Sequence, residues 1–213
     1  MARTGLAMMP AFPSFPLKSS QYTLSRTTDD TGGLFSLPAN NYDLRGERGL
    51  ADFDRRHKLD FAGTYEFPRD VKLSAVVNVR SGTPFNITTG SDDNHDTVAN
   101  DRPAGIGRNT GRGEAFYSFD LRLARRFFVK ENRFLEITVE GFNLFNRTNF
   151  QGINNIIGGA CVSNGLPVPC TAGATPLTDF NLRGRADQAP TSPLGFTSAS
   201  DPRQLQLGAR FNF

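Results

Sequence analysis

The chain has 213 residues, of which 38% are apolar and 21% are charged, and it contains 19 phenylalanines and no tryptophan. No run approaches the roughly 18 apolar residues that a membrane-spanning helix needs. The net charge of +3 comes from scattered arginines interleaved with acidic residues, which argues against nucleic acid as a partner. Abundant phenylalanine with few long apolar runs instead suits a sheet with one apolar face.

Six segments alternate between apolar and polar residues, the period-2 pattern of strands with one apolar face. Residues 1–18 are rich in proline, and we expect them to be irregular. In the final segment, the side chains that share the apolar face are Leu205, Leu207, Ala209, Phe211 and Phe213. The predicted strands cover residues 19–27, 57–67, 71–80, 117–129, 134–142 and 203–213.

The connections between these strands alternate between short and long. Those after the second and fourth strands have about three residues, whereas the other three run to tens of residues. All long loops therefore emerge on one side, as in outer-membrane barrels with short periplasmic turns and long extracellular loops. Six strands are fewer than the roughly eight of the smallest such barrels, so the chain is predicted to be part of a larger or an oligomeric barrel. The alternative is a soluble or surface-exposed all-β module for binding or adhesion.

The shared parity within each strand also predicts which side chains face lipid. An apolar face belongs against hydrocarbon and a polar face against the wet lumen. We expect Leu121, Val139 and Leu207 to face lipid, and Glu136, Glu140 and Gln206 to face the lumen or a neighbouring polar surface.

Six segments carry a resemblance to a known family. They are LRGERGLADFDRRHKLDFAGTYEFP (44–68), SGTPFNITTGSDDNHDTVANDRP (81–103), GRNTGRG (107–113), FDLRLARRF (119–127), EGFNLFNRTNF (140–150) and DPRQLQLGARFNF (201–213). In order and spacing they resemble the C-terminal end of TonB-dependent outer-membrane receptors. The most similar type is Oar-like, with an N-terminal carboxypeptidase-regulatory-like domain. The resemblance covers roughly residues 19–213.

This resemblance implies an all-β fold, an antiparallel meander of about six transmembrane strands in the cell outer membrane. It would be the C-terminal part of a barrel of roughly 22 strands closed by a plug, with residues 19–213 as the partial barrel. The sequence shows no plug and no TonB-binding segment. We therefore expect a structural part of a substrate-uptake pore that is not competent for transport alone and is not an enzyme. The expected partners are outer-membrane lipid, the remainder of the barrel and plug, and the barrel-assembly machinery through Phe213.

Asp92, Asn94 and Asp96 have the alternating spacing with which side-chain oxygens converge on calcium. The segment departs from the EF-hand, because Thr97 stands where glycine is wanted and Pro103 where the bidentate glutamate belongs. A solvated loop with Asx-turns explains the same residues. Calcium is therefore the one cofactor to test, and no other cofactor is expected.

Cys161 and Cys170, the only cysteines, lie in one predicted external loop. In an oxidising compartment a disulfide between them is the expectation, against two free thiols or a metal pair. The two histidines, His57 and His95, accompany no recognisable Ser or Cys nucleophile motif. Two polar clusters, residues 100–103 and 143–147, are interpreted as loop anchors rather than as substrate contacts.

Overall fold

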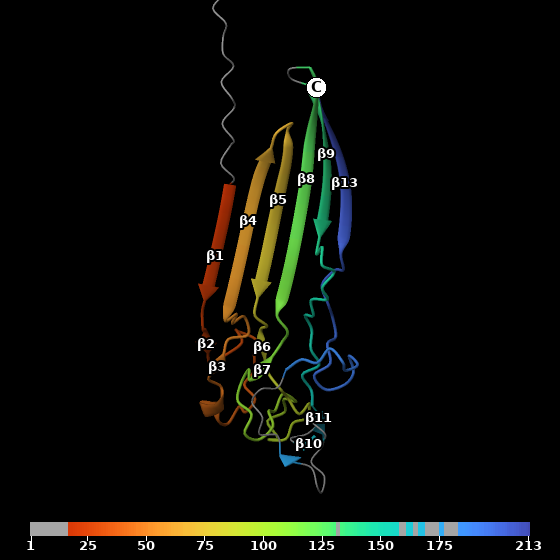
Figure 1. Ribbon diagram of the computed structural model, residues 1–213. Coiled ribbons are helices and arrows are strands. Elements are labelled where there is room, and N and C mark those ends of the chain that lie inside the picture. Colours follow the sequence, from red (N-terminus) through yellow and green to blue (C-terminus); the bar gives the residue numbers. More distant parts are fainter. Residues whose placement is uncertain (1–16, 131–132, 158–160, 164–165, 169–174, 177–182) are drawn as a thin grey trace, which may run out of the picture.

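The computed structural model describes residues 17–130, 133–157, 161–163, 166–168, 175–176 and 183–213. Its largest element is a six-stranded antiparallel sheet in which each strand pairs with the next one along the chain (Figure 1). The strands are β1 (Leu17–Leu24), β4 (His57–Phe67), β5 (Val71–Arg80), β8 (Phe116–Lys130), β9 (Arg133–Phe142) and β13 (Gln204–Asn212). The predicted all-β, antiparallel meander is confirmed for the described residues.

The six predicted strands all occur, and the first differs most in its bounds. It was expected over residues 19–27, but β1 spans Leu17–Leu24. The chain leaves the sheet at Ser25, whose backbone N–H donates to the carbonyl of Arg56 at 3.1 Å. Among the described residues, no helix is long and apolar enough to cross a membrane.

Short and long connections lie at opposite ends of the sheet. In Figure 1 the strand ends that the two short connections join lie at the top with the C-terminus, and the described parts of the three long connections lie at the bottom. The turn from β4 to β5 places Arg69 and Asp70 at φ of 67° and 56°, the left-handed pair typical of a two-residue hairpin turn. The predicted sorting of the loops by length is therefore present in the structure.

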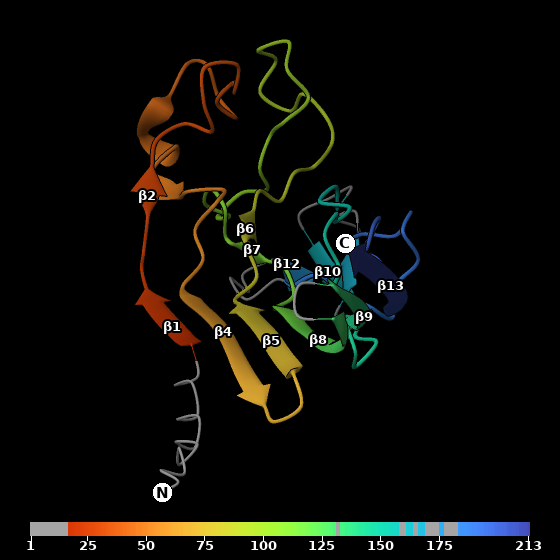
Figure 2. The same cartoon turned by 90° about the horizontal axis from the view of Figure 1, so that it is seen from above.

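The register fixes which side chains share a face of the sheet. Leu207 is opposite Val139, and Val139 is opposite Leu123. One position along, Gln206 is opposite Glu140, and Glu140 is opposite Arg122. Because directly opposed residues of neighbouring strands point to the same side, one face is apolar and the other polar. Seen from above, the strands follow an arc from β1 to β13 (Figure 2).

Arg125 is a charged residue on the apolar face. It is opposite Ile137 on β9 and Val71 on β5. Its guanidinium carbon lies 4.7 Å from the centre of the Phe127 ring, within the range of a cation–π contact. Arg125 lies near the short-turn end of β8, where a long side chain can reach the membrane interface.

The long connections contain short strands that the periodicity did not predict. These are β2 (Thr28–Asp29), β3 (Gly49–Leu50), β6 (Pro84–Phe85), β7 (Gly111–Arg112), β10 (Cys161–Ser163), β11 (Leu166–Val168) and β12 (Thr175–Pro176), together with a 3-10 turn at Leu44–Gly46. β2 pairs with β3, β6 with β7, and β10 with both β11 and β12. Segments of two or three residues are too short to show an alternation, so the sequence pattern misses them.

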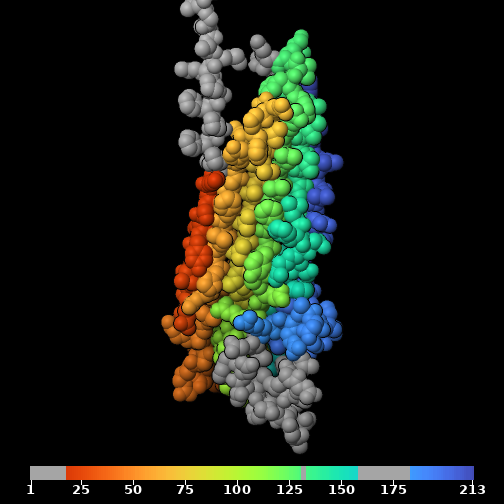
Figure 3. Space-filling model, in the orientation of Figure 1, coloured from red at the N-terminus to blue at the C-terminus, as the bar shows by residue number. Residues whose placement is uncertain are grey.

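The three connections pack together into a layer at the loop end of the sheet. Its small apolar core joins Ile87 and Ile106 of the second connection to Ile157 and Leu194 of the third, with Phe85 packed against them. In the space-filling view the strands form a continuous surface in chain order, and the mid-blue residues after 183 lie at the loop end (Figure 3). The described parts of the loops therefore form a packed layer, which positions the polar groups described next.

Candidate functional site

The polar face of the sheet carries a row of ion pairs where β8 and β9 lie side by side. Arg126 Nε lies 2.7 Å from Glu136 Oε2, and Arg122 Nε lies 3.2 Å from Glu140 Oε1. Each arginine is directly opposite its glutamate in the register. Arg122 also approaches Glu136, at 3.9 Å. The charges of these two arginines and two glutamates are thus balanced, as is usual on a hydrated polar surface.

Ion pairs continue across β4 and β5 on the same face. Lys72 Nζ lies 2.6 Å from Glu66 Oε1 near the short turn. Toward the loops, Asp60 lies between Lys58 at 3.2 Å and Arg80 at 3.4 Å. A cavity of about 350 Å³ lies at the short-turn end of this face, and its charged lining consists of Glu66, Asp70, Lys72, Arg122, Arg126 and Glu136. This arrangement can hold water or a polar partner.

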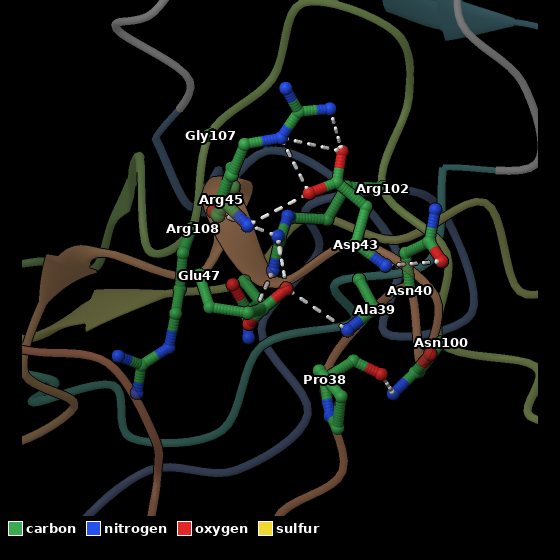
Figure 4. A network of polar contacts seen from close by, with 12 residues as sticks. Pro38, Ala39, Asn40, Asp43, Arg45, Glu47, Asn100, Arg102, Gly107 and Arg108 are labelled. Carbon is green, nitrogen blue, oxygen red and sulfur yellow. Dashed lines mark hydrogen bonds and ion pairs between the residues drawn. The ribbon is translucent and has the colours of Figure 1, made fainter.

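A nearly buried ion pair joins the first and second connections (Figure 4). Arg102 Nη2 donates to Glu47 Oε1 at 2.6 Å, and the two side chains are 10% and 9% exposed. The same oxygen of Glu47 accepts the backbone N–H of Ala39 at 3.1 Å. Asn100 Nδ2 donates to the carbonyl of Pro38 at 3.0 Å. Residues 100–102 are therefore tied to the segment 38–47.

Asp43 and Arg45 form a second pair in this network, at its exposed edge. Arg45 Nη2 donates to Asp43 Oδ2 at 2.6 Å, and the Arg45 backbone N–H donates to Asp43 Oδ1 at 3.1 Å. The side-chain hydrogen bond and then the backbone one lower the pKa of Asp43 from 3.8 to about 2. The carboxylate of Asp43 caps the 3-10 turn that follows it.

The polar clusters interpreted as loop anchors make the contacts that this interpretation predicts. Asp101 is buried, and its carboxylate accepts the backbone N–H of Asn94 at 2.9 Å and the side-chain amide of Asn94 at 2.6 Å. Asn143 Nδ2 donates to the carbonyls of Arg147 and Asp201, at 2.9 and 3.3 Å. Buried polar groups with such partners hold loop backbone in place.

The oxygens of the predicted calcium segment already accept backbone hydrogen bonds. Asp92 accepts the N–H groups of Asp96 at 3.0 Å and Thr97 at 2.9 Å. Asn94 Oδ1 accepts from Asp96 N–H at 2.9 Å, and Asp96 accepts from Asn41 and Val98. These are contacts of Asx-turn type. In the described part of the chain, no group of three or more His, Cys, Asp and Glu is arranged to hold a metal ion. Calcium binding there stays a prediction.

The histidines and cysteines occupy different surroundings. His57 begins β4, and its Nδ1 lies 2.8 Å from the hydroxyl of Tyr22, whose ring stacks on it at 6.2 Å. His95 lies in the Asx-turn segment with φ of 60°.

Cys161 begins β10, but Cys170 lies outside the described residues, so the disulfide stays a prediction. Residues 1–16 of the predicted irregular N-terminus lie outside them as well.

Comparison with known proteins supports the class of protein that the sheet indicates. The family model described as an outer membrane beta barrel domain matches residues 18–107. The matched segment contains β4, β5 and all of β1 but its first residue, together with the first long connection and most of the second. No curated protein and no solved structure matches the chain. The protein is located in the outer membrane, as predicted.

Proposed function

We propose that this chain is the C-terminal barrel segment of a TonB-dependent receptor and forms part of the wall of a substrate-uptake pore. The observation that carries the proposal is a six-stranded meander with one apolar face, one ion-paired polar face and all long loops at one end. The order and spacing of the segments that resemble the receptor family support the finer assignment.

The two edge strands of the sheet indicate that the segment needs further strands to complete a barrel. β1 and β13 stand at opposite ends of the strand order and do not pair with each other. Backbone groups left unpaired in hydrocarbon cost several kcal/mol each. The sheet therefore needs further strands beside β1 and β13, and we propose that the remainder of the receptor barrel supplies them. Its plug would then close the lumen against the polar face.

The segment would act as a passive wall. On its polar face, Arg122 and Arg126 of β8 are paired with Glu140 and Glu136 of β9. The wall would present a hydrated surface to the plug and to the passing substrate. Transport would depend on the plug and on energy delivered by TonB, and the chain alone would not carry it out.

A capture experiment tests this proposal. Outer membranes of the native cell are solubilised in detergent and passed over the immobilised periplasmic domain of TonB, and bound protein is detected with an antibody against this chain. We expect retention of a species larger than the 23.4 kDa of this chain. An outer-membrane porin serves as the unretained control. A protein that is found in the outer membrane but flows through with the porin would contradict the TonB-dependent assignment.

The alternative, a soluble binding or adhesion module, predicts a different distribution. It has to leave large apolar side chains such as Leu123, Val139 and Leu207 in water, where they are 43%, 42% and 79% exposed. An exposed apolar face of this extent suits lipid better than water. Recovery of the antigen in the soluble fraction, as a detergent-free monomer that unfolds cooperatively, would favour the alternative.

A further inference from the structure

Four arginines from distant parts of the sequence line one cavity where the loop layer meets the sheet. We call this cavity the arginine pocket and define it by Arg56, Arg112, Arg147, Arg183 and Glu114. Its volume is about 500 Å³, within the range of sites for small molecules. Arg56 comes from the first connection, Arg112 and Glu114 from the second, and Arg147 and Arg183 from the third. All three long connections thus contribute to it.

Two of the arginines are held by carboxylates. Arg112 Nη2 lies 3.4 Å from Asp54 Oδ2, whose side chain is fully buried, and Arg112 Nη1 donates to the carbonyl of Gly82 at 3.3 Å. Arg147 Nη2 lies 3.5 Å from Glu114 Oε2, and its guanidinium carbon is 4.8 Å from the centre of the Tyr117 ring. These contacts fix the two guanidinium groups and neutralise their charges.

The other two arginines have no carboxylate partner among the described residues. Arg56 and Arg183 are exposed, and neither has an ion pair with any described residue. Two positive charges therefore remain unbalanced at one cavity. On the rest of the sheet and loops, by contrast, many of the arginines pair with a carboxylate, as Arg122 does with Glu140.

Another arginine, Arg55, contacts the lining of the pocket. Arg55 Nη1 donates to the carbonyl of Ser81, a residue of the pocket lining, at 2.8 Å. Burial, and then repulsion from Arg80, lowers the pKa of Arg55. The positive charge of Arg55 thus lies next to the lining and adds to the charge of the pocket arginines.

We infer that the arginine pocket binds an anionic ligand through phosphate or carboxylate groups. Guanidinium groups bind such anions with two parallel charge-assisted hydrogen bonds. Arg56 and Arg183 would supply the charge, and the clamped Arg112 and Arg147 would shape the site. The inference deepens the proposed function, because it names the class of ligand received at the loop end of the pore wall. The same chemistry could be presented by a free anion or by the phosphates of an outer-leaflet lipid.

Calorimetric titration of the native outer-membrane protein in detergent tests the inference, with two probes. The first probe is inorganic pyrophosphate, and the second is lipid A in mixed micelles, compared with dephosphorylated lipid A. The test variant is Arg56→Gln/Arg183→Gln. The control is Arg26→Gln/Arg203→Gln, which removes the same charge from two exposed arginines outside the pocket.

We expect the wild type and the control to bind at least one probe, and the test variant to bind it about tenfold more weakly or worse. Binding of pyrophosphate identifies a free anion, and binding only of phosphorylated lipid A identifies a lipid headgroup. Failure of the wild type to bind either probe overturns the inference. An equal loss of affinity in test and control variants also overturns it, because it shows only a general charge effect.

Two further measurements distinguish a folding defect from a loss of anion binding, and a failure of the anion site from a failure of the proposed function. Heat-modifiable electrophoretic mobility should be unchanged in the test variant, because the replaced side chains are exposed and form no ion pair with a described residue. An unchanged mobility confirms that the variant folds. Retention on the TonB domain should also be unchanged. If the wild type binds the probe but is not retained on TonB, the proposed function fails while the anion site stands.

Discussion

Glu47 and Arg102 lie 55 positions apart in the sequence, yet their side-chain atoms Oε1 and Nη2 are 2.6 Å apart and nearly buried. The pair joins the first long connection to the second. Breaking a buried pair by removing one charge leaves the other charge uncompensated, and this costs more than the net stabilisation of the pair itself. The order of the loop layer is therefore sensitive to either residue.

We expect Glu47→Gln to destabilise the loop layer by about 3–5 kcal/mol. Amide hydrogen exchange at Ala39, whose N–H donates to Glu47 Oε1 at 3.1 Å, measures the loss directly. Arg45→Gln is the control, because it removes an arginine from an exposed pair, and we expect little change at Ala39. Unchanged protection of Ala39 in Glu47→Gln would show that the pair does not hold the layer.

The pH dependence of the first connection follows from Asp43. Because the pKa of its carboxyl is lowered from 3.8 to about 2 in the folded state, its contribution to stability is complete above pH 3.8. It is lost as the pH falls through about 2. Carbon-detected NMR of the Asp43 carboxyl should show a midpoint near 2. The midpoint should rise toward the ordinary value in Arg45→Gln. An ordinary midpoint in the wild type would show that the hydrogen bonds from Arg45 do not persist in solution.

Gly82 lies where the second connection leaves the sheet, in close contact with the backbone of Gly113. A Cβ atom at Gly82 would overlap the carbonyl of Gly113 and lie 2.8 Å from the carbonyl oxygen of Glu114. We expect Gly82→Ala to destabilise the loop layer by about 1–3 kcal/mol. Gly107→Ala is the control, since its Cβ would meet only the Thr110 methyl group at an ordinary 3.6 Å. Limited proteolysis of the loops compares the two, and equal sensitivity would contradict this prediction.

Periodicity predicted the sheet well because each long strand has one apolar and one polar face. β4 and β5 have the predicted bounds, His57–Phe67 and Val71–Arg80. The loop layer was not predicted, because its contacts join residues far apart in the sequence. The ion pair of Glu47 and Arg102 is one example, and no local pattern signals it.

The arginine pocket was missed for the same reason. Arg56, Arg112, Arg147 and Arg183 are scattered in the sequence, and scattered arginines interleaved with acidic residues look like an ordinary solvated surface. Only the packing of three connections shows which arginines meet and which lack a carboxylate. The Asx-turns at residues 92–96 illustrate the converse, since a spacing typical of calcium ligands also suits side chains that accept local backbone N–H groups.

The disulfide between Cys161 and Cys170 remains a prediction. It rests on the sequence, which places both cysteines in one connection that is predicted to lie outside the cell, where thiols oxidise. Mass spectrometry of peptides from non-reduced, alkylated protein should find the two residues linked. Two alkylated thiols in protein taken from the native outer membrane would contradict the disulfide.

The orientation of the sheet in the bilayer is tested by two neighbouring positions on β13. Leu207 is opposite Val139 on the apolar face, and Gln206 is opposite Glu140 on the polar face. A charge at a lipid-facing position near the midplane costs about 2–4 kcal/mol, whereas a lumen-facing position tolerates it. In the full-length protein, Leu207→Arg should lower the free energy of unfolding from bilayers by that amount in a urea titration. Gln206→Arg should change it by less than about 1 kcal/mol, because the new guanidinium would lie beside Glu140. Equal effects of the two substitutions would show that the apolar face does not contact hydrocarbon, and a larger effect of Gln206→Arg would reverse the two faces.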